Sequence, residues 1–353
     1  MKKEQNCRLG KVGGQAVLEG VMMKSGDNVA LAVRKDDGTV EVKNSTHVSV
    51  RKKNKLLNLP LIRGCVNMVE TLILSMGTLE DSANMLGIDE TEDETKFEKW
   101  LRRKFGDKLM SLVLGIGMVL GVLLSVGLFV LLPNFAVMGI NALCKYFGNF
   151  TLPSLAQNAI SGVIRIAIFV SYILLVSLMK DIRRTFEYHG AEHKSIACYE
   201  AGEELTAENA KKYTRFHPRC GTSFIIVVLI ISVVATSFIN WNTWPWFAII
   251  LTKLAMIPVI VGISFEFLIW AGKHPNAVTK VLSAPGLWMQ RATTKEPDLE
   301  QLEVAIIALK NAMPDQFPEV LEKNDESNVE AEAETEAEAE TEDAETCAAE
   351  DQK

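Results

Sequence analysis

Four long apolar runs are the feature that most limits what this chain can fold into. A helix needs about 20 mostly apolar residues to cross the roughly 30 Å of hydrocarbon in a bilayer. Inside the runs the only charged side chains are Arg165, Lys253 and Glu266. The sequence therefore predicts an α-helical membrane protein with about four transmembrane helices within residues 109–271. We expect the helices at Leu109–Leu132, Ala159–Met179, Phe224–Phe238 and Phe247–Trp270, the third extended backward through Thr222 and Ser223.

The distribution of positive charge predicts the orientation of these spans. Lys and Arg gather before the first span, between the second and third, and after the fourth. The opposite connections, 133–158 and 239–246, contain a single Lys or Arg between them, Lys145. Because loops rich in Lys and Arg stay in the cytoplasm, we expect a multi-pass protein of the cell membrane with both termini and the central loop in the cytoplasm. Arg165 can snorkel to the headgroups if it lies near the outer end of its span.

The sequence pattern of residues 1–60 predicts a small cytoplasmic β-rich unit. Val29–Val33 and Thr39–Val42 are strand-like runs on either side of the turn signal Asp36-Asp37-Gly38. Ser45–Val50 can form another strand, and the glycines between residues 10 and 20 fit tight turns. They do not predict a phosphate-binding loop, because the Walker spacing and its strand–helix context are both missing.

Two helical segments flank the spans. Residues 61–108 predict cytoplasmic or interfacial helices, beginning with Leu61–Leu86, which has too many polar interruptions to span with ease. Residues 272–318 predict a cytoplasmic interfacial segment that bears Trp288 and then a helix from about Asp298 to Met313. The expected apolar face of that last helix comprises Leu299, Leu302, Ala305, Ile306 and Leu309.

The C-terminal tail, 319–353, is expected to be disordered, since an Ala, Glu and Thr run cannot bury a core. Residues 324–353 hold thirteen acids and one base, so the rest of the chain carries +5 of the total net charge of −7. No basic cluster predicts nucleic-acid binding, and the expected partners are the lipid bilayer, other membrane proteins or a second copy of the chain. Six scattered cysteines without paired spacing predict reduced thiols.

The residues that suggest chemistry gather in the connection between the second and third spans, 180–222. His189 and His193 lie four apart, so on a helix both imidazoles project from one face and can hold one divalent metal. Glu192 completes the H-x-x-E-H pattern, in which the Glu of inverted zinc peptidases is the general base. Such a short pattern also arises by chance. The alternative is that these groups cap helix ends and bond to one another at the membrane surface.

Further ligands can come from three places. His217 and Cys220 form an H-x-x-C pair on a turn, and Glu200 lies on nearly the same helical face as the two histidines. Glu266 is an ionisable residue near the cytoplasmic end of the fourth span, which makes it a functional candidate by default. It can approach the central loop as a ligand or pair with a cation such as Lys273. Zinc, which accepts nitrogen, sulfur and carboxylate oxygen, is the metal we expect.

Four separated motifs resemble those of the YqhQ-like family, bacterial multi-pass membrane proteins that carry a domain of unknown function. The motifs are 13–23, His189–Lys194, His217–Gly221, and Thr293–Pro297 followed by Gln301 and Glu303. The resemblance covers about residues 8–315 and implies a membrane location and a metal-dependent enzyme without an established reaction. It also implies that four further residues belong to the same cytoplasmic assembly as the histidines, namely Gln15, Glu19, Arg34 and Arg63.

The leading hypothesis is a cytoplasm-facing, metal-dependent hydrolase. His189 and His193 would bind the metal, Glu192 would be the base, and Arg219 and Lys194 would stabilise a developing anion. The third ligand would come from His217, Cys220, Glu200 or Glu266. The alternative is a non-enzymatic membrane scaffold or assembly factor, in which the loop is a structural metal knuckle or holds no metal. A transporter is disfavoured, since four spans with one carboxylate and no internal repeat offer little pathway.

Overall fold

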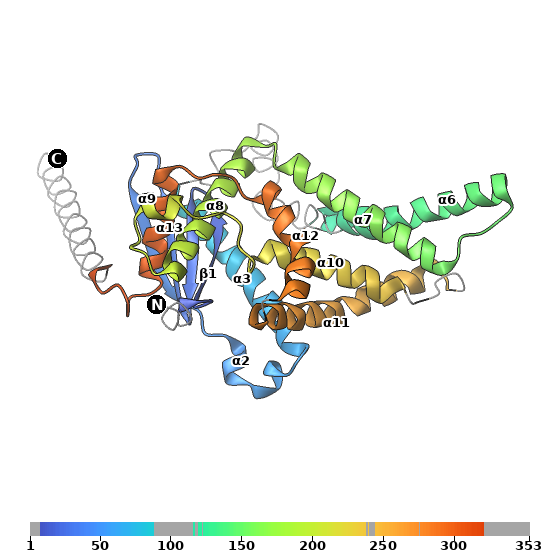
Figure 1. The fold of residues 1–353 in the computed structure, drawn as a ribbon, viewed down its shortest axis with the longest axis horizontal. Coiled ribbons are helices and arrows are strands. Elements are labelled where there is room, and N and C mark those ends of the chain that lie inside the picture. The colour runs from blue at the N-terminus through green and yellow to red at the C-terminus, as the bar shows by residue number, and fades with distance from the viewer. Residues whose placement is uncertain are drawn as a thin grey trace, which may run out of the picture.

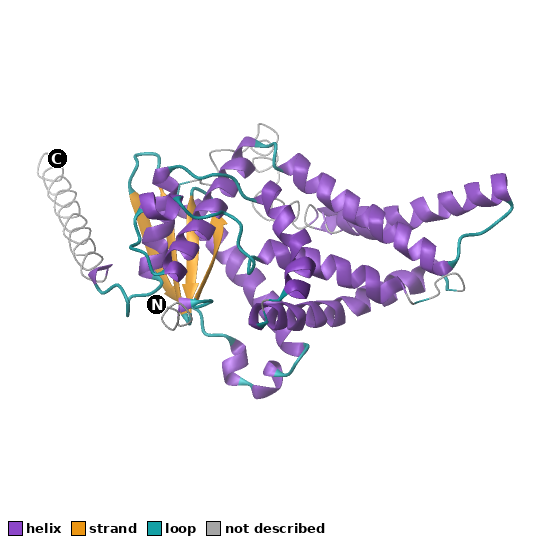
Figure 2. Ribbon diagram, in the orientation of Figure 1, coloured by secondary structure: helices purple, strands orange, loops and turns teal. Residues whose placement is uncertain are grey.

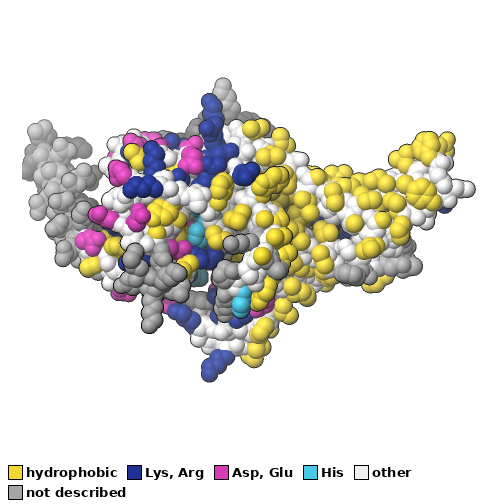
Figure 3. Space-filling view, viewed as in Figure 1, with side chains coloured by type: hydrophobic (Ala, Val, Ile, Leu, Met, Phe, Trp, Pro, Cys, Tyr) yellow, Lys and Arg dark blue, Asp and Glu magenta, His cyan; other side chains and the backbone are white. Residues whose placement is uncertain are grey.

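The computed structural model describes residues 8–87, 116, 119–121, 123–237, 239, 244–274 and 276–320. A polar part built around a small sheet joins an elongated bundle of apolar helices (Figures 1 and 2). Figure 3 shows charged side chains over the sheet and hydrophobic side chains over the bundle. The expected tail beyond residue 320 and the basic segment before the first span lie outside the described residues.

A four-stranded antiparallel sheet confirms the predicted β-rich unit. Its strands are β1 (Val12–Val17), β2 (Gly20–Ser25), β3 (Asn28–Arg34) and β4 (Val40–Thr46), in that spatial order. The turn at Asp36-Asp37-Gly38 is also confirmed, because Gly38 has φ +87° and its N–H donates to the Lys35 carbonyl at 3.0 Å.

The prediction of another strand at Ser45–Val50 is wrong. β4 ends at Thr46, and the chain enters the short helix α2 (Val50–Lys53). Ser49 caps this helix, since its side chain accepts a hydrogen bond from the Arg51 N–H. Serine at such a position satisfies a backbone donor that the helix leaves open, and this local bond competes with strand pairing.

Helix α3 (Ile62–Met85) follows the short helix η1 (Lys55–Asn58) and confirms the predicted helix within one residue at each end. It bridges the two parts of the molecule. Gly64 lies so close to α11 that a Cβ there would be 2.7 Å from the Phe265 Cβ. Farther along, Thr78 accepts a hydrogen bond from Gln15 of β1 at 2.6 Å. The helix therefore packs against a core as well as carrying exposed apolar side chains.

Among the described residues, three helices are long and apolar enough to cross a membrane, which supports a membrane protein. They cover Val119–Gly148, α7 (Ser154–Val176), and Phe247–Ala271 within α11 (Trp246–Lys273). The predicted third span is the apolar helix α10 (Gly221–Ser237), which has only 17 residues. It begins before Thr222 and Ser223, as the sequence suggested.

The connection that the sequence placed at 133–158 contains an unexpected helix, because residues 133–148 are helical. A π-helical turn, η2 (Gly127–Leu131), leads into α6 (Leu132–Gly148), which runs through Pro133. Proline lacks an N–H and displaces the carbonyl four residues earlier, here that of Phe129. This carbonyl instead accepts a hydrogen bond from Arg165 Nε at 3.1 Å. Arg165 lies midway along α7 and does not sit at its outer end, so the condition for snorkelling is not met.

The polar part has a core formed jointly by both ends of the described chain. Helices α8 (Lys180–Ala201), α9 (Ala207–Lys211) and α13 (Leu299–Asn311) pack with β1–β3 around one apolar cluster. Asp298 begins α13 with a capping box, as expected, and Leu302 and Leu309 on its apolar face are fully buried. Leu299 is the exception at 39% exposure. Helix α12 (Ala277–Thr293) packs along α10 and connects this core to the bundle.

Candidate metal centre

Helix α8 carries His189 and His193 on one face, and their ring centroids are 4.5 Å apart. Each ring is oriented by a backbone carbonyl. His189 Nδ1 bonds to the Thr293 oxygen at 2.8 Å, and His193 Nδ1 bonds to the Arg215 oxygen. Because a carbonyl oxygen can only accept, each Nδ1 carries the proton and each Nε2 keeps a lone pair. This is the tautomer in which Nε2 can bind a metal.

Cys220 completes a group of three donor atoms. Its Sγ lies 3.2 Å from His189 Nε2, and the donor atoms of Cys220 and both histidines lie within 4.8 Å of one another. His193 Nε2 is buried and has no hydrogen-bond partner within the described part of the chain. An unsatisfied buried polar atom costs about 1–3 kcal/mol. A divalent ion would remove that cost, and two imidazoles with one thiolate are ligands that zinc accepts.

Glu192 lies beside the same group. Its Oε2 is 3.8 Å from His189 Nε2 and 3.7 Å from His193 Nε2. The carboxyl group is almost fully buried, and this burial raises the pKa of Glu192, while the nearby His189 and His217 oppose the rise. A tetrahedral zinc with bonds of about 2.0–2.3 Å separates its ligand atoms by roughly 3.3–3.8 Å. Glu192 can therefore act either as a base beside an ion or as a fourth ligand.

His217 and Glu200 form a second group next to the first. His217 Nε2 lies 3.7 Å from Glu200 Oε2, and the other carboxylate oxygen pairs with Arg219. Burial alone would raise the pKa of Glu200, but the neighbouring His217, a hydrogen bond from the Gly10 N–H and the charge of Arg219 lower it overall. The His217 ring centroid is 5.5 Å from that of His193. His217 and Glu200 thus lie near the three donor atoms, but they interact with each other.

Glu266 lies elsewhere in the fold. Its Oε1 accepts a hydrogen bond from Arg63 Nε at 2.6 Å, and the second oxygen pairs with the same guanidinium. The first turn of α3 packs against α11, which brings the side chains of Arg63 and Glu266 together. The sequence suggested pairing with a cation as one of two choices, and Arg63 is the partner that the structure provides.

The residues implied by the family resemblance belong to the same assembly but contact other groups. Gln15 bonds to α3, Glu19 pairs with Arg184, and Arg34 lies 3.2 Å from Glu300. The two cations proposed to stabilise an anion also have carboxylate partners. Lys194 lies 2.8 Å from Glu296, and Arg219 pairs with Glu200.

Three further residues shape the site, and periodicity did not single them out. Gln290 is fully buried, and its amide bonds to the His217 N–H at 2.8 Å and to the His217 carbonyl at 2.7 Å. A Cβ at Gly190 would overlap the Lys295 carbonyl, so only glycine lets α8 approach the segment that orients His189. Gly14 of β1 is similarly close to Glu192. Gly14 and Gly190 lie inside the motifs 13–23 and His189–Lys194, which were the available signal for them, whereas no motif contained Gln290.

Comparison with known proteins agrees with the motifs. A family model described as "Protein of unknown function (DUF1385)" matches residues 59–315. The chain is 36% identical over 299 residues to the uncharacterized protein YqhQ of Bacillus subtilis (strain 168), covering 83% of this chain and 89% of the relative. No solved structure matches. The chain therefore belongs to the YqhQ-like family, whose domain is of unknown function.

Proposed function

We propose that the chain is a membrane-bound, metal-dependent hydrolase whose site lies at the cytoplasmic end of α10. The observation that carries the proposal is the buried Nε2 of His193, which lacks a hydrogen-bond partner within the described residues and lies beside His189 Nε2 and Cys220 Sγ. Without a cation His189 Nε2 and Cys220 Sγ bond to each other, and His193 Nε2 stays unsatisfied beside them. With a zinc ion they supply three of the four ligands of an open site.

In this mechanism His189, His193 and Cys220 hold the ion, and the carbonyls of Thr293 and Arg215 keep both imidazoles in the binding tautomer. A divalent ion bound there would act as a Lewis acid. Glu192 Oε2 accepts a proton from the attacking water, since it lies on the Nε2 side of both rings.

A structural metal knuckle in a membrane scaffold is the second candidate. It is favoured by the nearly equal distances of Glu192 Oε2 from the two Nε2 atoms, 3.8 and 3.7 Å. If Glu192 is a fourth ligand, the site is closed and leaves no position for a substrate. The two candidates share the ion and differ in the role of Glu192.

The first test is metal analysis of the full chain purified in detergent. We expect about one zinc ion per chain, lost in the double variant His189→Ala/His193→Ala. His274→Ala is the control, because its ring bonds to the Trp270 carbonyl on α11 and belongs to neither group. Absence of metal from the wild type after reloading with zinc would reject both candidates.

Glu192→Gln separates the base from the ligand. For a base, the variant keeps one zinc ion with nearly unchanged affinity and keeps an exchangeable solvent position, detected by X-ray absorption. For a fourth ligand, removal of the carboxylate weakens zinc binding by about tenfold or more, and the wild type shows four protein ligands. The second outcome would refute the hydrolase and support the scaffold.

We propose in addition that the protein is multi-pass with both termini in the cytoplasm. The balance of Lys and Arg across the spans supports this orientation. Single-cysteine variants test it in intact cells with a membrane-impermeant thiol reagent. Thr151→Cys, between α6 and α7, should react, whereas Ser327→Cys in the acidic tail should react only after lysis. Labelling of the tail in intact cells would reverse the assignment.

A further inference from the structure

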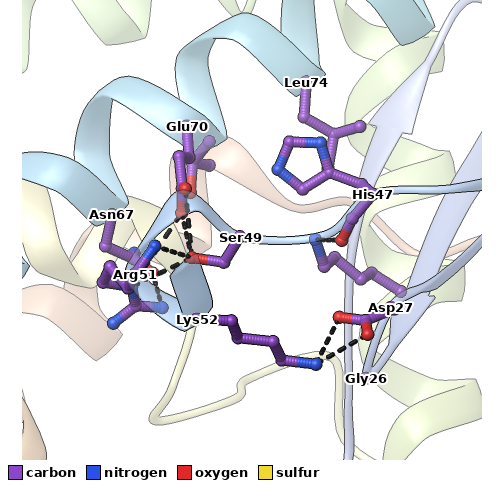
Figure 4. Close-up of a pocket in the computed structure, with 11 residues that line it drawn as sticks. Gly26, Asp27, His47, Ser49, Arg51, Lys52, Asn67, Glu70 and Leu74 are labelled. Atoms are coloured by element: carbon purple, nitrogen blue, oxygen red, sulfur yellow. Dashed lines mark hydrogen bonds and ion pairs between the residues drawn. The ribbon is translucent and has the colours of Figure 1, made fainter. Parts of the chain in front are cut away.

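A separate pocket lies between the sheet and α3 (Figure 4). Helix α3 packs on the opposite face of the sheet from α8, which carries the two histidines. Its volume is about 240 Å³. Pockets for drug-sized ligands measure about 300–1,000 Å³, so this one suits a group the size of a phosphate ester. The walls come from the β2–β3 turn, the segment after β4, α2 and α3.

The two acids of the pocket are already engaged. Lys52 Nζ lies 2.6 and 2.7 Å from the carboxylate oxygens of Asp27. Glu70 accepts hydrogen bonds from the Ser49 hydroxyl at 2.8 Å and from the Val50 N–H at 2.7 Å, at the start of α2. Figure 4 shows the bonds of Lys52 to Asp27 and of Ser49 to Glu70. The carboxylates therefore stabilise the walls of the pocket, and neither forms an ion pair with Lys24.

Lys24 is the donor that points to a ligand. Its Nζ donates to the His47 carbonyl at 3.3 Å, and no carboxylate in the described ranges forms an ion pair with it. Burial lowers the pKa of Lys24, although Glu70 and Asp27 act in the opposite direction. An ammonium group has three donors, so two remain for a ligand. A bound anion would compensate its charge.

The other side chains that line the pocket also favour an anionic ligand. Asn67 Oδ1 accepts a hydrogen bond from Arg51 Nη2 at 3.2 Å, which leaves the amide N–H group as a donor. Three cations and two acids line the pocket, a net charge of +1 with His47 neutral, and protonation of His47 would add to it. Donors of this kind bind phosphate oxygens by charge-assisted hydrogen bonds.

We propose that this pocket binds a phosphate ester, and that its source is the headgroup of an anionic phospholipid. The pocket walls continue into α2 and η1, where Val50 and Leu56 are 45% and 66% exposed. One helical turn before Asn67, Arg63 docks α3 onto the apolar helix α11. A headgroup at this junction could enter the pocket while its acyl chains remain beside the exposed apolar side chains. A soluble phosphate ester would offer the same chemistry, and the test distinguishes the two.

The test is a thermal-unfolding titration of the full chain in detergent micelles. The probes are dioctanoyl phosphatidylglycerol, dioctanoyl phosphatidylcholine, glycerol 3-phosphate and inorganic phosphate. We expect phosphatidylglycerol to raise the Tm in a saturable way, with a Kd about tenfold or more weaker in Lys24→Gln, because a charged hydrogen-bond donor is lost. Lys24→Arg should retain part of the affinity. The control Lys35→Gln, which removes an exposed partner of Glu41, should bind like the wild type.

Each outcome decides the proposal. If glycerol 3-phosphate or phosphate matches phosphatidylglycerol at equal concentration, the phosphate site is supported and its source is soluble. Equal effects of phosphatidylcholine and phosphatidylglycerol, or unchanged binding in Lys24→Gln, would overturn it. If Lys24→Gln does not fold, Asn67→Asp replaces it, because the added negative charge should abolish binding. Undiminished affinity in that variant would also overturn the site.

Discussion

Gly14→Ala is expected to damage both the fold and the metal centre, because β1 passes unusually close to α8 at this residue. A Cβ at Gly14 would lie 2.6 Å from the Met22 carbonyl oxygen and 3.0 Å from Glu192 Cγ. Real Cβ atoms essentially never come closer than 3.0 Å to another heavy atom. The neighbouring strand must therefore shift by several tenths of an ångström, and the Met22 oxygen belongs to backbone that pairs with β1.

The sign of the change in stability depends on two opposing effects. Replacing glycine reduces the freedom of the unfolded chain and stabilises the fold by about 0.4–1 kcal/mol where the space permits. Overpacking of a well-packed site costs about 1–3 kcal/mol. The clash therefore outweighs the entropic gain at Gly14, and we expect a net loss of about 1–2 kcal/mol, which is roughly 2–8 °C in Tm.

Gly13→Ala is the matched control, since it changes the next residue of the same strand. A Cβ at Gly13 meets no other atom within 4 Å among the residues that the structure describes. Its Tm should stay equal or rise, whereas Gly14→Ala should lower the Tm. Displacement of Glu192 in Gly14→Ala should weaken zinc binding if Glu192 is a fourth ligand and leave it nearly unchanged if Glu192 is the base. Thermal unfolding and chelator competition in detergent measure both quantities. If the two variants behave alike, the close packing of β1 on Glu192 is refuted.

Three further outcomes are expected. Gln290→Leu should weaken zinc binding by about tenfold to a hundredfold, measured by chelator competition. The reason is that the His217 turn loses both of its backbone hydrogen bonds to the amide. Unchanged affinity would show that the turn is held by other contacts. Arg63→Ala should lower the Tm, and Arg63→Ala/Glu266→Gln should recover part of the loss, because the second change removes the carboxylate left without Arg63; no recovery would argue against the ion pair. Burial would raise the pKa of Glu296, but Lys194 and Arg215 lower it overall. The ionised Glu296 therefore stabilises the fold fully above the pKa of the unfolded state, and this stabilisation is lost as pH falls through the lower pKa of the folded state. Glu296→Gln should therefore reduce the loss of Tm between pH 5 and pH 3, by a small amount because the side chain is 62% exposed.

Local patterns predicted the elements that depend on neighbours in sequence. The four-residue spacing of His189 and His193 was enough to expect both rings on one helical face, and the rings do lie together. The apolar periodicity after Asp298 similarly located the start of α13. These features depend on helix geometry within one or two turns, which the sequence carries directly.

The contacts that could not be predicted from the sequence join segments far apart in the chain. Glu266 was recognised as costly in a span, but its partner Arg63 lies 203 residues away. Pro133 is ordinarily a stop signal for a helix. The helix continues here because Arg165 of another helix satisfies the freed Phe129 carbonyl. No local pattern encodes such compensation, so the helix over residues 133–148 was not predicted.

The third donor atom shows why the metal centre depends on the whole fold. Cys220 precedes α10 directly, whereas His189 and His193 belong to α8 of the polar part. Gln290 of α12 holds the intervening turn in place, and α12 packs along α10. The three donor atoms therefore meet only when the sheet-containing core and the apolar bundle are docked. A fragment cut before residue 220 would keep both histidines and lose the thiolate, so it should bind zinc far more weakly than the full chain.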